Sequence, residues 1–218
     1  MASRSVSRRT FLKSALAGGA LTAVGGGTAL ARAVAAPKPA KKADYALIID
    51  TTKCVGCGAC KVACNLRNNL PEGQSYIHIL RRSEGEKELF LPVQCQHCAD
   101  PPCAHVCPTN ATYIRNDGVV LINEKLCVGC KYCMVACPYQ ARIFDEERGV
   151  ADKCWLCLDD VLVGGEPACV HACVLGARLF GRTDNPDGEV TQLIASGQAK
   201  PLHPEFGTEP AVLRYIIE

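Results

Sequence analysis

Residues 127–138 read CVGCKYCMVACP and have the spacing C-x2-C-x2-C-x3-C-P. In iron-sulfur proteins, a run of this kind gives three thiolates to one cluster and the fourth to a neighbouring cluster. The ligands fix the path of the backbone around the metal, so this spacing decides the local fold. The stretch therefore predicts at least two cubane [4Fe-4S] clusters close together.

Three further groups of four cysteines lie on either side of this stretch, and each ends in Cys-x-x-x-Cys. One has the same spacing, and the other two lengthen only the interval before the third cysteine. In chain order the four groups are Cys54, Cys57, Cys60, Cys64; Cys95, Cys98, Cys103, Cys107; Cys127, Cys130, Cys133, Cys137; and Cys154, Cys157, Cys169, Cys173. We interpret them as variants of one module that supply sixteen iron ligands, enough for four [4Fe-4S] clusters.

Zinc and disulfides are the competing uses of these thiols. Structural zinc usually takes two cysteine pairs separated by a longer loop, without a third cysteine close to the second. An exported chain with many cysteines normally forms disulfides, but bunched cysteines would have to pair across short, strained loops. A zinc or disulfide scaffold for protein interactions is therefore a remote alternative.

The first 35 residues carry an export signal. Residues 7–13 read SRRTFLK and precede an uncharged, Gly/Ala-rich stretch at residues 14–31. This is the pattern of a twin-arginine signal, and small residues near position 35 offer cleavage sites. The twin-arginine route exports proteins that have folded and taken up cofactors in the cytoplasm. We expect residues 1–35 to be removed and the mature protein to be periplasmic.

The composition after removal of the leader argues against nucleic-acid binding. The leader holds five basic residues and no acidic one, so 19 basic residues then face 22 acidic ones and the formal charge moves from +2 to −3. Thiolate-bound clusters add negative charge, which removes the electrostatic basis for binding nucleic acid. The apolar run at residues 212–217 is short and contains Arg214, so we expect no membrane span after the leader.

Internal repeats relate the four groups in the order a-b-a-b. Residues 48–64 recur as residues 121–137, whereas the segment around Cys107 resembles the segment around Cys173. Between groups two and three, residues 111–122 read as two strands joined by a turn, which predicts a hairpin. Group, hairpin, group is the layout of a two-cluster bacterial ferredoxin. Short helices are expected to carry each C-x3-C end.

The predicted fold class is α+β, with two interleaved bacterial-ferredoxin-like units built from short helices and β-hairpins around a cofactor-rich core. The inner unit spans residues 95–137, and the outer unit spans residues 36–94 and 138–218. Exchange of the last thiolate within each unit predicts four ligand sets. We call them Cys54, Cys57, Cys60, Cys173 (quartet 1); Cys95, Cys98, Cys103, Cys137 (quartet 2); Cys127, Cys130, Cys133, Cys107 (quartet 3); and Cys154, Cys157, Cys169, Cys64 (quartet 4). Spacing alone leaves open the alternative that group one pairs with two and group three with four.

The chain resembles the four-cluster electron-transfer subunits of the dimethyl sulfoxide reductase family. Within that family it is most similar to the periplasmic iron-sulfur subunits of tetrathionate, polysulfide and thiosulfate reductases. The likeness runs from about Tyr45 to the C-terminus, and it is carried by YALIID (45–50), CQHC (95–98), PPC (101–103), CVGC (127–130), ACPY (136–139), ADKC (151–154) and PEFGT (204–208). In this family interleaved ligation is the rule.

The resemblance implies a non-catalytic subunit of anaerobic respiration. Such a subunit relays electrons through [4Fe-4S] clusters between an integral membrane quinol-oxidising subunit and a periplasmic molybdopterin catalytic subunit, and a partner holds it at the membrane. A periplasmic hydrogenase or a multihaem nitrite reductase is an alternative partner. Some relatives replace one cysteine of group four by tryptophan and hold a [3Fe-4S] cluster, but here Trp155 stands beside a complete set. No nucleotide loop or nucleophile motif points to chemistry on a substrate.

Several basic side chains flank the cysteines. Each group already has four thiolates, so we expect packing or hydrogen bonding rather than iron ligation from His97, His105 and His171. Four lysines are expected either to favour the reduced, more negative clusters or to be simply solvated: Lys53, Lys61, Lys131 and Lys153.

Overall fold

The computed structural model describes residues 43–85 and 87–217. The leader, residues 1–35, and the start of the predicted outer unit, residues 36–42, lie outside the described residues. All the described residues belong to one compact unit.

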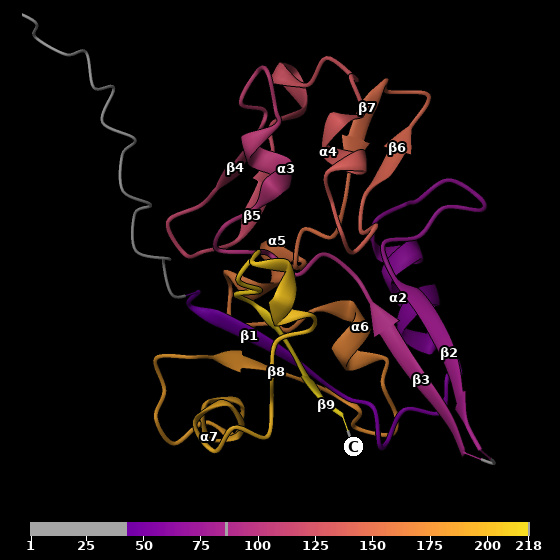
Figure 1. The fold of residues 1–218 in the computed structure, drawn as a ribbon, viewed down its shortest axis with the longest axis vertical. Helices are drawn as coiled ribbons and strands as arrows, with labels where there is room; N and C mark the ends of the chain where they lie inside the picture. The colour runs from indigo at the N-terminus through magenta and orange to yellow at the C-terminus, as the bar shows by residue number, and fades with distance from the viewer. Residues whose placement is uncertain (1–42, 86, 218) are drawn as a thin grey trace, which may run out of the picture. The chain divides into compact units, whose positions relative to one another are not determined.

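β1 (Tyr45–Asp50) is the middle strand of the main sheet (Figure 1). It pairs antiparallel with β8 (Arg178–Arg182) and parallel with β9 (Leu213–Ile216). Alternate β1 side chains point to opposite faces of the sheet. Leu47 and Ile49 therefore pack among the cysteines, while Ile48 packs on the other face with Val190 of α7 (Glu189–Ala195). Both faces of β1 are covered, and all six of its residues are buried.

Three hairpins complete the strands of the described residues. The longest joins β2 (His78–Glu84) to β3 (Lys87–Val93). The second joins β4 (Thr112–Ile114) to β5 (Val120–Ile122), which confirms the hairpin predicted between groups two and three. The third joins β6 (Ile143–Asp145) to β7 (Val150–Asp152) and follows group three. Two of the three hairpins thus lie directly after a cysteine group.

Four of the helices carry cysteines. The prediction of a helix across each C-x3-C end holds in full only for the first of these helices, but the third cysteine of every group lies in one of them: α2 (Ala59–Arg67), α3 (Pro102–His105), α4 (Tyr132–Val135) and α6 (Ala168–His171). Only α2 continues through the last cysteine of its group. After α3 and α4, Pro108 and Pro138 bias the cysteine before them away from the helical conformation. The remaining short helices in the described part of the chain are α5 (Leu158–Val161), η1 (Glu124–Leu126) and η2 (Pro204–Phe206).

The helices pack in pairs that are distant in sequence. α2 of group one lies against α6 of group four, and α3 of group two lies against α4 of group three. Cysteines make up much of the resulting core: seven are buried, seven are partly buried, and Cys57 and Cys130 are exposed. Small helices, a small sheet and hairpins around a cysteine-rich core fit the predicted α+β class. In the described part of the chain, no helix has the length and apolarity needed to cross a membrane.

Candidate iron-sulfur centres

One left-handed residue recurs at the same position of all four C-x2-C segments. The residue before the second cysteine is left-handed in each case, with φ of 69° at Gly56, 46° at His97, 68° at Gly129 and 61° at Leu156. Glycine adopts this conformation freely, whereas an ordinary residue pays about 1–2 kcal/mol. His97 and Leu156 adopt this conformation although neither is glycine, and the recurrence of one left-handed position in four segments supports four variants of one module.

The two glycines of these turns differ in what a side chain would meet. A Cβ on Gly129 would lie 2.6 Å from the backbone oxygen of Gly149, whereas a Cβ on Gly56 would meet the ring of Phe90. Left-handed strain of about 1–2 kcal/mol applies to both positions, but only the Phe90 ring can rotate away. We expect Gly129→Ala to lower the thermal midpoint and iron content more than Gly56→Ala does. Equal losses, measured by melting and iron assay, would contradict this.

Two of the predicted quartets each surround a cavity. The four cysteines of quartet 1 line the first, so Cys173 of group four lies with three cysteines of group one. The four cysteines of quartet 3 line the second, and there Cys107 of group two lies with three cysteines of group three. Each cavity is also lined by an arginine, Arg178 in the first and Arg142 in the second. In both places the last cysteine of one group comes to the first three of another.

Quartet 2 is more enclosed. The thiol of Cys98 interacts electrostatically with those of Cys95, Cys103 and Cys137, which are the other three members of the quartet. Quartet 2 therefore brings three cysteines of group two together with the last cysteine of group three.

Quartet 4 is the most deeply buried set. The thiol of Cys64 interacts most strongly with those of Cys169 and Cys157, and less with that of Cys60 in its own helix. Cys154 interacts with Cys64 and Cys169. A residue of α2 is therefore surrounded by the cysteines of group four.

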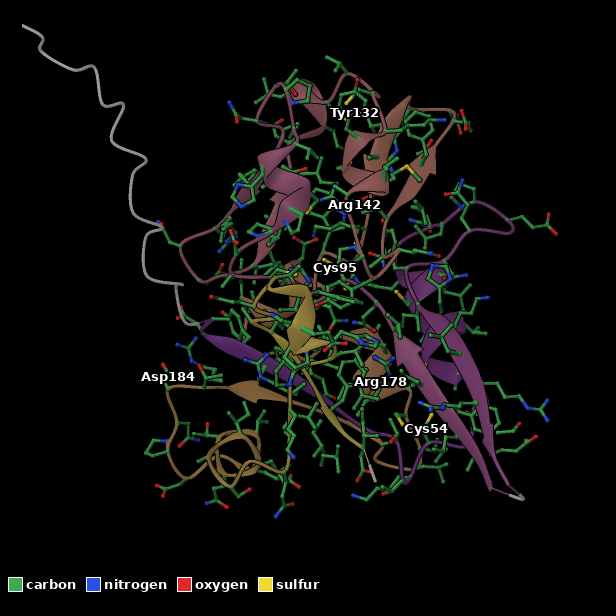
Figure 2. The ribbon with its side chains drawn as sticks, in the orientation of Figure 1. Cys54, Cys95, Tyr132, Arg142, Arg178 and Asp184 are labelled. Carbon is green, nitrogen blue, oxygen red and sulfur yellow. The ribbon has the colours of Figure 1, made fainter. Side chains whose placement is uncertain are left out.

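The quartets are arranged in the order 1, 4, 2, 3. Quartets 1 and 4 both adjoin the guanidinium of Arg178. Cys154 of quartet 4 interacts with Cys95 of quartet 2. Quartets 2 and 3 both adjoin Arg142. Figure 2 shows Cys54 near one end of this series and Tyr132, next to Cys133, near the other.

Burial makes most of these thiols hard to ionise. It raises the pKa of Cys64 and of Cys98 to about 12, and that of Cys154 well above its usual value. At Cys107 burial acts in the same direction, but hydrogen bonds, led by the backbone of Thr112, outweigh it and lower the pKa. Iron binds the thiolate. The buried cysteines are therefore neutral unless a metal displaces their protons.

Three buried cations lie among the cysteines. The exposed fractions are 0% for Lys153, 3% for Arg178 and 6% for Arg142. Burial lowers the pKa of Lys153, with opposition from the thiol of Cys95 in quartet 2, and its Nζ donates to the carbonyl oxygen of Cys154 in quartet 4 at 2.7 Å. Lys153 is thus not a solvated lysine, because neighbouring segments enclose it. In contrast, Lys53 and Lys131 are about half-exposed and form ion pairs with acidic residues.

Sequence reasoning missed the two arginines. Burial alone would lower the pKa of each, but thiolate neighbours, Cys169 for Arg178 and Cys103 for Arg142, outweigh it and raise the pKa. The sequence contains a pattern that could have indicated them. The last cysteine of groups three and four begins the same pattern, Cys-x3-Ala-Arg, at residues 137–142 and 173–178.

The histidines near the cysteines differ in their surroundings. His97 is fully buried, and its Nδ1 accepts a hydrogen bond from the backbone of Val120. His105 and His171 are exposed and lie beside the carboxylates of Asp100 and Glu166. These contacts agree with the expected packing and hydrogen-bonding roles.

Within residues 43–85 and 87–217, no three histidine, cysteine, aspartate or glutamate side chains are arranged to hold a metal ion. A zinc ion draws its sulfur ligands to about 2.3 Å from a single point. A cubane cluster binds one thiolate at each of its irons, so its ligands do not have to converge.

Comparison with known proteins identifies the family. Residues 53–111 and residues 87–183 each match a 4Fe-4S dicluster domain, and residues 5–25 match the signal sequence of the twin-arginine translocation pathway. A subunit of the tetrathionate reductase of Salmonella typhimurium is 41% identical over 176 residues, which cover 77% of this chain and 70% of that protein. A component of the polysulfide reductase of Wolinella succinogenes is 38% identical over 175 residues, covering 76% and 91%. The protein therefore belongs to the family of reductase iron-sulfur subunits. This iron-sulfur subunit is also 39% identical to the protein NrfC of Escherichia coli over 215 residues, covering 95% and 94%.

These findings confirm three predictions made from the sequence: the family, [4Fe-4S] clusters as the type of cofactor, and a twin-arginine signal that directs export to the periplasm. Relatives described as iron-sulfur and electron-transfer subunits of reductases also confirm electron transfer as the function of the iron-sulfur subunit.

The buried arginines fit the presence of clusters. In the described part of the chain, Nη2 of Arg142 and Nη2 of Arg178 are buried and have no hydrogen-bond partner. A buried polar group without a partner costs about 1–3 kcal/mol, and more when it is charged. Thiolate-ligated clusters supply negative charge and sulfur acceptors, so both the thiol donor set and the two unpaired nitrogens suit this cofactor.

Proposed function

We propose that the iron-sulfur subunit holds four [4Fe-4S] clusters, one in each quartet, and relays electrons between an integral membrane quinol-oxidising subunit and a periplasmic molybdopterin subunit. The observation that carries the proposal is the gathering of sixteen cysteines into four neighbouring sets of four, in the order 1, 4, 2, 3. When bound, each cluster accepts and releases one electron. Relatives that are subunits of tetrathionate, thiosulfate and polysulfide reductases favour a sulfur compound as the final acceptor.

The two ends of the series support a relay. Cys57 of quartet 1 and Cys130 of quartet 3 are the exposed cysteines, while quartets 2 and 4 lie deeper. Large apolar side chains are exposed beside both ends, with Val55 and Val174 near quartet 1 and Val128 near quartet 3. Exposed apolar groups that gather in one place mark interaction surfaces. Quartets 1 and 3 are therefore the places where partners exchange electrons with the protein.

The residues of the protein hold and insulate the clusters but do not transform a substrate. Each quartet has four cysteines, so every iron has a protein ligand and none is left open for a substrate. Gln94 shows how the surroundings support a ligand. Its amide donates to Cys154 Sγ at 3.7 Å, and its oxygen accepts from Arg178 at 2.9 Å. We propose a non-catalytic subunit.

The proposed units follow the ligand sets. Residues 95–137 form the inner unit with quartets 2 and 3, and residues 36–94 and 138–218 form the outer unit with quartets 1 and 4. The packing of α3 on α4 and of α2 on α6 supports this division. The β6–β7 hairpin belongs to the outer unit in sequence, yet Phe144 and Ala151 pack with the cysteines of the inner unit. The hairpin of the outer unit therefore packs directly against the inner unit.

Purification of the tagged protein from membranes of its own host tests the proposal. We expect about sixteen irons per chain, no stoichiometric zinc, and co-purification of a molybdopterin subunit and an integral membrane subunit. A periplasmic hydrogenase or a multihaem cytochrome in their place would establish the alternative partner. Stoichiometric zinc, or far fewer irons, would overturn the proposed cofactor content.

A further inference from the structure

Groups three and four share an arginine that groups one and two lack. The fifth residue after the last cysteine is Arg142 in group three and Arg178 in group four, but Asn69 in group one and Thr112 in group two. Each proposed unit combines one group of each kind. Each unit therefore contains one such arginine.

Arg178 lies between quartets 1 and 4. It lines the cavity of quartet 1 together with all four of its cysteines. Its Nη1 also donates to the Sγ of Cys169 in quartet 4 at 3.4 Å. Figure 2 shows it close to Cys54. One guanidinium thus contacts both ligand sets of the outer unit.

Arg142 has the equivalent position between quartets 2 and 3. It lines the cavity of quartet 3, and its guanidinium interacts electrostatically with the thiol of Cys103 in quartet 2. Its Nη1 also lies 3.3 Å from the hydroxyl of Thr112, the residue at the matching position of group two. Figure 2 shows it between Cys95 and Tyr132. The relation of arginine to quartets is the same in both units.

Neither arginine has an acidic partner. Among the described residues, no carboxylate forms an ion pair with Arg142 or Arg178, although most other arginines of this part of the chain have one. A buried charge is retained in proteins when an opposite charge compensates it. The nearby groups able to carry negative charge are the cysteines of two quartets.

We propose that Arg142 and Arg178 are charge-compensating residues, each acting on two clusters at once and raising the reduction potentials of both clusters in its unit. This inference rests on the proposed ligand sets. A cluster becomes more negative on reduction, so a fixed positive charge beside it stabilises the reduced form. Because each guanidinium touches two quartets, its removal lowers two potentials, and the pair affected differs between the two arginines.

The test is a potentiometric titration of the purified full-length holoprotein, followed by electron paramagnetic resonance. We expect Arg178→Met to lower the potentials of two clusters by at least about 59 mV, a tenfold change in the reduction equilibrium of a one-electron couple. Arg142→Met lowers the potentials of the other two. The two variants shift different pairs of clusters. The effect can therefore be recognised even when it is not known which paramagnetic resonance signal belongs to which cluster.

Arg182→Met is the matched control. Arg182 lies on the same strand, β8, but is exposed and paired with Asp184, so the variant removes the same charge without touching a quartet. We expect no cluster to shift in this variant. Equal shifts in Arg182→Met and Arg178→Met would overturn the proposal, because net charge rather than local compensation would then be responsible.

Charge-retaining variants cover the case in which the methionine variants fail to assemble clusters. Loss of iron in Arg178→Met, with full iron content in Arg178→Lys, supports the requirement for charge. Equal loss of iron in both variants, or a shift of one cluster, of none or of all four, overturns the proposal. If the wild type holds about sixteen irons per chain, the proposed function stands even when the proposal for the arginines is overturned.

Discussion

Cys64→Ala should remove one cluster, and the lost cluster should be that of quartet 4 rather than that of the rest of group one. Cys64 follows Cys60 on α2, yet its thiol interacts most strongly with those of Cys169 and Cys157. The packing of α2 against α6 brings it there. We expect the iron content to fall from about sixteen to about twelve per chain, measured by iron and acid-labile sulfide assays.

Double variants show which cluster was lost. Two ligands of one cluster are not independent, so their losses are not additive. Cys64→Ala combined with Cys157→Ala should lose no more iron than either change alone. Cys64→Ala combined with Cys57→Ala should lose two clusters. Loss of two clusters in the Cys64→Ala/Cys157→Ala variant would support the alternative in which group one pairs with group two, because Cys64 would then belong to the cluster of Cys95, Cys98 and Cys103.

Removal of iron should unfold the described part of the chain. Buried thiols such as Cys64, whose pKa burial raises to about 12, become neutral once iron leaves. Arg142 and Arg178 then lose their counter-charges inside the core. An uncompensated buried charge costs about 3–5 kcal/mol, so the two together are comparable with the roughly 5–15 kcal/mol that stabilise a whole domain.

The measurement is far-ultraviolet circular dichroism with thermal melting, before and after chelation under anaerobic, reducing conditions. The holoprotein should melt cooperatively, and the iron-free protein should show no cooperative transition. Holoprotein in the same buffer without chelator is the control. A cooperative melt of similar midpoint in the iron-free protein would contradict the expectation that the fold depends on its clusters.

Local features of the fold could be predicted from the sequence because they depend on residues close together in the chain. The hairpin around residues 116–118 was predicted from a turn between two apolar runs, and β4 and β5 confirm it. Helices at the third cysteine of each group follow from helical spacing. The left-handed turns at His97 and Leu156 could not be predicted this way, because neither residue favours that conformation.

Burial of charge was harder to predict. Lys153 was expected to act on clusters or to be solvated, and the structure encloses it completely. The arginines at 142 and 178 were not among the predicted site residues, although each stands five residues after the last cysteine of its group. A sequence shows that a residue is charged. Whether that charge is buried depends on segments that pack over it from elsewhere in the chain.

The spacing of sixteen cysteines, the leader and the internal repeats by themselves determined that this is an exported iron-sulfur protein, because short-range geometry limits which groups can surround a metal. The tertiary structure alone decided which cysteines gather, as Cys173 does with Cys54 around one cavity, and which cations lie between the sets. The pairing of β1 with β8 and β9 and the packing of helices distant in sequence bring these residues together. Such contacts are set by burial of the whole chain, which local spacing does not encode.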